Sequence, residues 1–348
     1  MAAEASANAV RPLTPDRVAD WERLVESSPD ATVFHTLGWF RAVAESFRYR
    51  PAYRLVYDSA SERPIAAVPG FLVPEPTGVS VVNPFCEYGF PLVHTGADEQ
   101  AVLARLASET PTPFGARILK DAQWTGCSEY RTPAYGCTRT GYTVRVRTDG
   151  PEDPSERFDD DVPRGIRIAR ENGVTVEPTD PEALYPQYLE TMRRLGSPPF
   201  QERFFVALGE HLPDTATALL ARIDDEVVGG VLLLEWADTT MVWANASNPT
   251  YWDAKPNHLL YARSIARAVT QGRHVVDLGR TRSDSGVAEF KAKFGGTRSP
   301  LASFVAPPHR RSRASLESYT DLQALTSRLS PIVGHRTIGP LLKEAIHE

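Results

Sequence analysis

Apolar and polar positions along the chain predict the same order of elements twice. Apolar residues at helical spacing predict amphipathic helices, and short apolar runs bounded by polar turns predict strands and hairpins. In the first half these are two helices, a hairpin, a helix and two strands, over residues 15–28, 37–47, 53–73, 98–109, 116–120 and 143–147. In the second half they are two helices, a hairpin, a strand, a helix and two strands, over residues 182–195, 201–211, 217–236, 240–244, 257–271, 274–276 and 301–305.

Both halves can be read in one order, in which two helices precede a hairpin, a strand, a helix and a strand. Such internal similarity predicts a duplicated unit, although two hairpins can resemble each other by chance. Residues 148–163 are acidic, contain three prolines and lack apolar periodicity, so they predict a linker. We therefore expect a mixed-sheet α/β protein with domains over 1–150 and 151–310 and a C-terminal helical extension over 311–348.

Composition and charge narrow the class of protein. The chain has 348 residues, of which 42% are hydrophobic and 24% charged, as in ordinary globular proteins. Its net charge of −6 does not favour nonspecific binding to nucleic acid, although a local basic groove is compatible with it. No run approaches the roughly 20 apolar residues of a membrane span, and the N-terminus lacks the pattern of a secretory signal.

The three cysteines bear on the cellular compartment. Cys86, Cys127 and Cys137 are spaced unlike the ligands of a zinc site, and their odd number argues against a disulfide framework. Free thiols are typical of reducing compartments. We therefore expect a cytoplasmic protein with no bound metal and no integral membrane segment.

Residues 274–296 contain the strongest candidate for a functional site. An apolar strand ends at Asp277, a turn with Gly279 follows, and Lys291 and Lys293 come next. The chain has 33 Arg and only five Lys, so lysine at this place suggests a need for a compact ammonium. One interpretation is a solvated lysine pair on a helix face. The other is one wall of a site for an anionic or acyl substrate.

The same residues resemble a motif of the FemAB family of peptidoglycan-bridge aminoacyltransferases. The resemblance covers about residues 34–305 and rests on Asp277-x-Gly279-Arg280, Gly286 and Phe290-Lys291-x-x-Phe294-Gly295, with support from Phe34-His35, Tyr88-Gly89 and residues 191–199. It implies two tandem GNAT-type acyltransferase domains. It also implies direct transfer of an aminoacyl or acyl group to an amine of a cell-envelope or polysaccharide precursor.

The resemblance implies an acyl donor that acts as a co-substrate, with no bound cofactor. The donor is aminoacyl-tRNA in the family, but the chain lacks the long helical hairpin that some members carry. It also lacks the pyrophosphate loop of ordinary acetyl-CoA enzymes, because the nearest stretch, Arg164-Gly165-Ile166-Arg167, has the wrong spacing. Aminoacyl-tRNA and acyl-CoA therefore both stay open as donors. The expected acceptor is an anionic glycan or a lipid-linked precursor.

Acyl transfer needs a group that stabilises the developing oxyanion. The resemblance places Lys291 near the reacting carbonyl or the leaving group, with Phe290 packed beside it. A fixed ammonium there can act without transferring a proton. Lys293 points elsewhere if the segment is helical, so it is the weaker candidate.

The other candidates are expected to bind substrate. Arg280 and Arg282 follow a strand end and could hold a phosphate, or pair with nearby aspartates. Asp277 fits a turn or cap better than a base. The basic helix face with Arg164 and Arg167 is either a salt-bridged surface or an anion site.

The aromatic loop of the first half adds Glu87 and Tyr88 as possible contacts for the amine or sugar, and Trp39, near the start of the resemblance, is a further candidate for substrate binding. His35, His94 and His258 have no partner carboxylate at motif spacing and fit structural roles. Two other functions stay open. One is acyl-CoA-dependent N-acyl transfer to a small amine or amino sugar, and the other is non-catalytic binding of a phosphate-bearing glycan.

Overall fold

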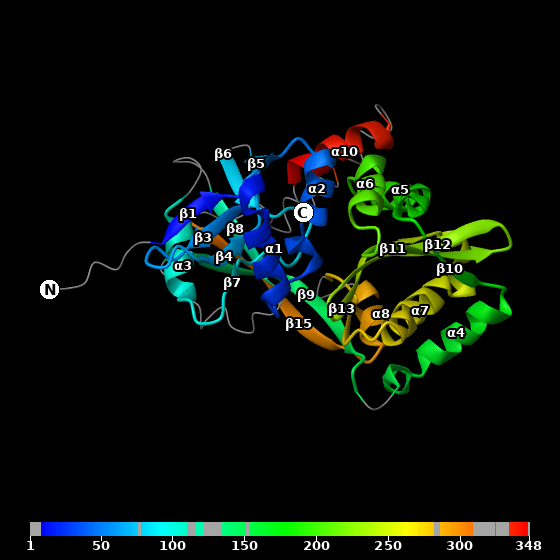
Figure 1. The fold of residues 1–348 in the computed structure, drawn as a ribbon. Helices are drawn as coiled ribbons and strands as arrows, with labels where there is room; N and C mark the ends of the chain where they lie inside the picture. The colour runs from blue at the N-terminus through cyan, green and yellow to red at the C-terminus, as the bar shows by residue number, and fades with distance from the viewer. Residues whose placement is uncertain are drawn as a thin grey trace. The chain divides into compact units, whose positions relative to one another are not determined.

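The computed structural model describes residues 8–75, 78–109, 116–121, 134–150, 153–281, 286–308, 324 and 334–346 (Figure 1). The chain divides into two compact units. Unit 1 comprises Met1–Thr140, Leu301–Ser315 and Ala345–Glu348, and unit 2 comprises Gly141–Pro300 and Leu316–Glu344. Strands β9 (Gly136–Arg147) and β15 (Thr297–Ala306) each run through a boundary, so the chain passes between units within strands.

The helices of unit 1 form where apolar residues recur at helical spacing. Thr14 and Pro15 begin η1 (Pro15–Arg17), which leads into α1 (Val18–Ser27). A proline suits the first turn of a helix because its missing N–H has no partner there. The buried face of α1 carries Trp21, Leu24 and Val25. The helix that follows, α2 (Leu37–Ser46), begins at Thr36, whose hydroxyl accepts a hydrogen bond from the Trp39 amide.

The strands of unit 1 are short and mostly antiparallel. One sheet has the order β1-β3-β4-β7, with β1 (Ala9–Pro12), β3 (Arg54–Tyr57), β4 (Pro64–Val68) and β7 (Leu92–Val93). A second group is made of β2 (Arg50–Pro51), β5 (Phe71–Glu75), β6 (Gly78–Val82), β8 (Ala116–Asp121) and the end of β15. Strands β6 and β8 are parallel, and α3 (Glu99–Ala107) lies between them in sequence.

Unit 2 is built on a mixed sheet with the order β10-β11-β12-β13-β14-β9. Its new strands are β10 (Thr175–Thr179), β11 (Ala216–Ile223), β12 (Glu226–Trp236), β13 (Thr239–Ser247) and β14 (Val275–Asp277). Its helices are α4 (Asp161–Glu171), α5 (Tyr185–Leu195), α6 (Glu202–His211), α7 (Pro256–Thr270), α8 (Gly286–Ala292) and α10 (His335–Ile346), whose last two residues fall in unit 1.

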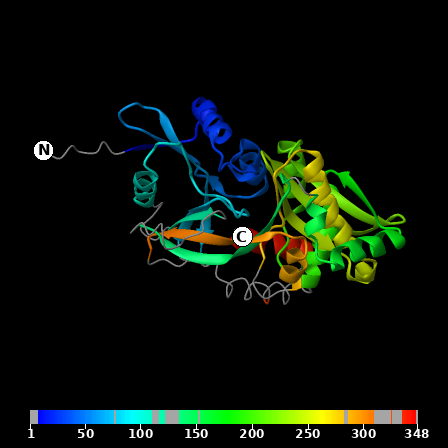
Figure 2. The ribbon, with the colours of Figure 1, turned by 90° about the horizontal axis from the view of Figure 1, so that it is seen from below.

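The sheet of unit 2 is covered on both faces. Figures 1 and 2 show α5 and α6 on one face of β11 and β12, and α4 and α7 on the other. Two adjacent glycines of β12 mark these faces, because a Cβ on Gly230 would meet Leu184 of η4 (Pro181–Leu184) and a Cβ on Gly229 would meet Leu260 of α7. Burial on both faces explains why β11 and β12 are almost continuously apolar.

The predicted order of elements is confirmed in unit 2, and in unit 1 except for β6, which was not predicted between the hairpin and α3. Two helices, a hairpin, a strand, a helix and a parallel strand occur as α1, α2, β3–β4, β6, α3 and β8, and again as α5, α6, β11–β12, β13, α7 and β14. The mixed α/β fold class is therefore correct. The expected linker over 148–163 lies within unit 2 and contains η3 (Pro154–Arg157) and the start of α4.

Three expectations about local structure need correction. The helix α7 begins at Pro256 with Lys255 as its N-cap, rather than at Asn257, because proline takes the first helical position. Strands β1, β2, β6, β7 and β10 were not predicted, and the second arm of the hairpin expected over 53–73 divides into β4 and β5 of different sheets. Of the C-terminal helical extension expected over 311–348, the structure describes only position 324 and residues 334–346, which contain α10.

The cysteines also differ from expectation. Cys137 is disulfide-bonded, while Cys86 is free and buried. An odd count excludes a fully paired set but leaves room for one disulfide, so the inference of a reducing compartment loses its basis. Among the helices that the structure describes, none has both the length and the apolar character required to cross a bilayer.

Candidate functional site

The candidate site lies in unit 2, where β13 and β14 stop pairing. The two parallel strands pair only over Thr239–Met241 and Val275–Asp277. Just beyond, β13 contains a β-bulge, because Leu232 of β12 pairs with Ala244 and Leu233 pairs with Val242. Bulges often occur next to active sites, where they redirect side chains.

A tight turn follows β14 and depends on glycine. Gly279 has φ +77°, and a Cβ at this position would lie 2.5 Å from the Val242 carbonyl oxygen. Glycine is needed because side chains are disfavoured at positive φ and the neighbouring strand leaves no space. The turn is held from inside by Asp277, whose Oδ1 accepts a hydrogen bond from the Gly279 amide at 2.7 Å.

Lys291 lies against the same turn. Its side chain comes from α8 and the residue is only 5% exposed. The ammonium donates to the Gly279 carbonyl oxygen at 2.8 Å and to the Arg280 carbonyl oxygen at 3.1 Å. Lys291 is therefore a buried cation with a fixed position, and the solvated interpretation does not apply to it.

Lys293 differs from Lys291 in its surroundings. Its side chain is 35% exposed and forms an ion pair with Asp161 of α4. This pairing raises the pKa of Lys293 and lowers the pKa of Asp161. Lys293 thus has the surface role that the sequence favoured for it.

Phe290 belongs to an aromatic cluster that supports α8. Its ring centroid lies 5.0 Å from His258, 5.2 Å from Tyr261 and 5.2 Å from Phe294. Burial is the main cause that lowers the pKa of His258, so this imidazole favours its neutral form. Phe290 therefore packs α8 against α7, and Lys291 follows it directly in sequence.

The other predicted residues of unit 2 occupy different environments. Asp277 is fully buried and holds the turn, which is the structural role expected for it. Arg280 is partly buried and gives its carbonyl oxygen to Lys291. Arg282 lies outside the described residues. Arg164 and Arg167 are exposed on α4, where Arg167 pairs with Glu171 at 3.2 Å.

The three candidates from the first half belong to unit 1. Trp39 is fully buried and its indole N–H donates to Asn83 at 3.3 Å, so it is a core residue. Tyr88 is 8% exposed and stacks on Phe34 at 6.1 Å, while Glu87 is partly buried. Asp277, Arg280, Phe290 and Lys291 therefore lie together in unit 2. The three candidates from the first half belong to the other unit.

Two features of the site have no signal in the sequence. Thr143 of β9 donates its hydroxyl proton to Asp277, 134 residues away. Asn245, late in β13, lies 3.4 Å from Asn257 at the start of α7. A threonine in a strand or an asparagine near a helix start is too common to single out, so only the fold identifies these residues.

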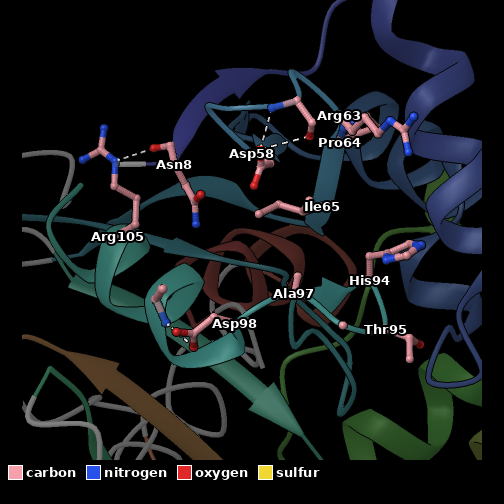
Figure 3. Close-up of a pocket in the computed structure, with 13 residues that line it drawn as sticks. Asn8, Asp58, Arg63, Pro64, Ile65, His94, Thr95, Ala97, Asp98 and Arg105 are labelled. Carbon is pink, nitrogen blue, oxygen red and sulfur yellow. Dashed lines mark hydrogen bonds between the residues drawn. The ribbon is translucent and has the colours of Figure 1, made fainter. Parts of the chain in front are cut away.

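A separate pocket of about 660 Å³ lies in unit 1 (Figure 3). It is lined by the turn between β3 and β4, by Asn8, and by the loop before α3. Its carboxylates are used locally, since Asp58 caps its own turn and Asp98 caps α3. No residue predicted to bind substrate lines this pocket.

Comparisons with known proteins agree with this architecture. Residues 157–292 match the family model described as an acetyltransferase (GNAT) domain. Among solved structures, FemX is similar with 14% identity and a TM-score of 0.60, over 85% of this chain and 96% of that one. L-PGS from Bacillus licheniformis is similar with 14% identity and a TM-score of 0.53, over 92% and 98%.

A tandem GNAT protein from the clavulanic acid biosynthesis pathway has 13% identity and a TM-score of 0.54, over 87% of this chain and 100% of that one. A comparison with curated protein sequences gives no match. At these identities the similar structures establish the fold, which is the tandem GNAT arrangement expected from the sequence. The family match lies within unit 2 and includes Lys291, so this part of the chain is similar to GNAT acetyltransferase domains.

Proposed function

We propose that this protein transfers an aminoacyl or acyl group directly to an amine of a cell-envelope or polysaccharide precursor. One observation carries the proposal. Within the GNAT domain, a buried ammonium is fixed at the place where β13 and β14 stop pairing. The cell-envelope acceptor is the one implied by the resemblance to the FemAB family, and the similarity in fold to FemX supports it.

The proposed reaction has no covalent enzyme intermediate. The amine nitrogen of the acceptor attacks the acyl carbonyl carbon and forms a C–N bond. Negative charge develops on the carbonyl oxygen, and the bond to the leaving oxygen or sulfur then breaks as the amine gives up a proton, which the leaving group takes up. The charge of Lys291 would stabilise the oxyanion or the leaving group, because an ammonium held in a buried site needs little reorganisation.

A second candidate is acyl-CoA-dependent transfer to a small amine or amino sugar. The GNAT match over residues 157–292 supports it, because acyl-CoA is the usual co-substrate of that fold. The similarity in fold to the tandem GNAT protein from the clavulanic acid biosynthesis pathway also supports this second candidate. The two candidates differ in donor and in the size of the acceptor.

The proposal is tested by replacing Lys291→Met, which keeps the length of the side chain and removes its charge. We expect kcat/KM for acyl transfer to fall by roughly 100-fold, the usual cost of removing one oxyanion-stabilising group. Lys293→Met is the matched control, because this neighbouring lysine is on the surface, and it should stay within about threefold of wild type. Thermal melting of both variants separates loss of chemistry from loss of folding.

The donor is decided in the same assays by supplying acetyl-CoA or aminoacyl-tRNA with each acceptor class. Turnover with either donor supports acyl transfer, and turnover with acetyl-CoA and small amines alone selects the second candidate. Full activity of folded Lys291→Met would reject the assigned role of this lysine. Binding of a nucleotide sugar without turnover of any donor would select a non-catalytic module.

A further inference from the structure

We infer that Thr143 is a positioning residue that fixes Lys291 through Asp277 and Gly279, an inference that rests on the function proposed above. Thr143 touches no reacting atom in this account. Its hydroxyl group donates to Asp277, and the turn that Asp277 holds presents two carbonyl oxygens to Lys291.

Asp277 is buried, so its charge depends on nearby hydrogen-bond donors. This carboxylate is fully buried, and a buried carboxylate is tolerated only when hydrogen-bond donors surround it. Two of its donors are the Thr143 hydroxyl and the Gly279 amide. Thr143 is itself 1% exposed, so water has little access to replace its hydroxyl.

Strand β9 shapes the turn through two backbone hydrogen bonds. Beyond Asp277, the Leu278 amide donates to the Val144 carbonyl oxygen and the Thr281 amide donates to the Tyr142 carbonyl oxygen, each at 2.8 Å. Gly279 and Arg280 lie between these two hydrogen bonds. Thr143 stands between Tyr142 and Val144, and its hydroxyl group donates to Asp277 at the start of the turn.

Gly279 links the carboxylate of Asp277 to the ammonium of Lys291. Gly279 donates its amide to the Asp277 carboxylate at 2.7 Å and gives its carbonyl oxygen to the Lys291 ammonium at 2.8 Å. A movement of Asp277 therefore moves the atoms that hold Lys291. Since Val242 blocks one side of Gly279, the turn has little freedom to absorb such a movement.

The inference is tested with Thr143→Val, which keeps the shape of the side chain and removes its donor, and with Thr143→Ser, which keeps the donor. The chain has only five lysines, so the Lys291 ammonium can be observed by NMR in protein labelled with ¹⁵N-lysine. Thr143→Val should speed exchange of the Lys291 ammonium protons by about fivefold, the effect of one lost hydrogen bond. Thr143→Ser should restore slow exchange, and Lys293 should not change in either variant.

Kinetics give an independent readout. Thr143→Val should lower kcat by about fivefold with an unchanged KM for the donor, and should cause no further loss in a Lys291→Met background. Additive losses in that double variant, or unchanged ammonium exchange in folded Thr143→Val, would overturn the inference. If Thr143→Val does not fold, Thr143→Ala serves in its place, because it also removes the donor, and the same outcomes apply.

The two proposals fail in different ways. If wild-type protein transfers no acyl group to any acceptor, the proposed function is wrong, while the ammonium exchange still tests whether Thr143 positions Lys291. If acyl transfer depends on Lys291 but not on Thr143, the function stands and the positioning role is rejected.

Discussion

The hydrogen bonds of His35, a buried residue of unit 1, depend on the protonation state of its ring. Its Nε2 lies 2.8 Å from the Phe90 carbonyl oxygen, and its Nδ1 lies 3.1 Å from the Thr32 amide nitrogen. A carbonyl needs a donor and an amide needs an acceptor, so the contacts fit the neutral ring with its proton on Nε2. His35 is thus a structural histidine, as the sequence suggested.

This arrangement predicts a loss of stability in acid. Burial is the main cause that lowers the pKa of His35 from 6.5 to about 4. The unfolded chain therefore binds a proton first, and the stability from neutral His35 is complete above pH 6.5 and decreases as the pH falls towards 4. The loss over this window should be about 3 kcal/mol.

The measurement is the thermal midpoint of wild type and of His35→Gln between pH 7 and pH 4. Glutamine can donate to the Phe90 carbonyl but does not titrate in this range. The midpoint of wild type should fall more steeply than that of the variant. Parallel curves for the two proteins would contradict the assignment.

Residues differ in how far sequence alone can identify them. Lys291 could be found because lysine is rare in this chain and a strand and a glycine turn precede it. Trp39 was predicted to bind substrate, yet it is fully buried, since large aromatics are more often core residues than ligands. Thr143 could not be found, because its role depends on a partner 134 residues away.

At the scale of elements, an ion pair attaches α7 to β12. Arg267 donates to both carboxylate oxygens of Glu235, at 3.0 and 2.9 Å. The Glu235 side chain is 1% exposed, whereas that of Arg267 is 30% exposed. Because water has little access to the Glu235 carboxylate, this carboxylate depends on Arg267 of α7 as a partner.

Removing Arg267 alone should lower the free energy of unfolding. Arg267→Met leaves the Glu235 charge buried without its main partner, and we expect a loss of about 3 kcal/mol in unfolding free energy. Arg263→Met is the matched control, one turn earlier and exposed, and it should cost less than about 0.5 kcal/mol. Adding Glu235→Gln to Arg267→Met should recover most of the loss in urea unfolding. Equal stability of the two single variants would refute this account.

The elements that sequence predicted well are those with strong periodicity. α1, α2, α5 and α7 each have an apolar face that packs on a core, so their spacing is visible in the chain. β10 was missed because its residues are mostly exposed or partly exposed and it contains Pro178. Edge strands are defined by their partners more than by their own side chains.

At the scale of the whole molecule, the duplication is a property of chain order within each unit. In both units a helix lies between two parallel strands, as β6-α3-β8 and as β13-α7-β14. Apolar periodicity predicted this order in unit 2, but it did not predict β6 of unit 1. It did not predict that β9 and β15 run through the boundaries between units, because nothing in a strand's own pattern identifies its neighbours.

The net charge of the molecule leads to a prediction about the donor. The chain has 44 acidic and 38 basic residues, and its net charge is −6. Among the described arginines of α4, Arg167 is already paired with Glu171. Such a surface opposes the binding of many phosphates. We therefore expect a donor that is held mainly by its acyl end, for which kcat/KM depends only weakly on salt concentration.

We expect kcat/KM for the preferred donor to fall by less than about tenfold between 50 and 200 mM salt, since a protein that contacts 6–10 phosphates of a nucleic acid loses roughly 10³–10⁵ in affinity over this range. The measurement is kcat/KM against salt concentration, with an uncharged acceptor analogue so that the donor alone is tested. A decrease of 10³ or more would mean that basic residues are concentrated along one path, despite the acidic total. That result would favour tRNA as the donor, whereas a shallow curve favours a donor bound through one or two phosphates, as acyl-CoA would be.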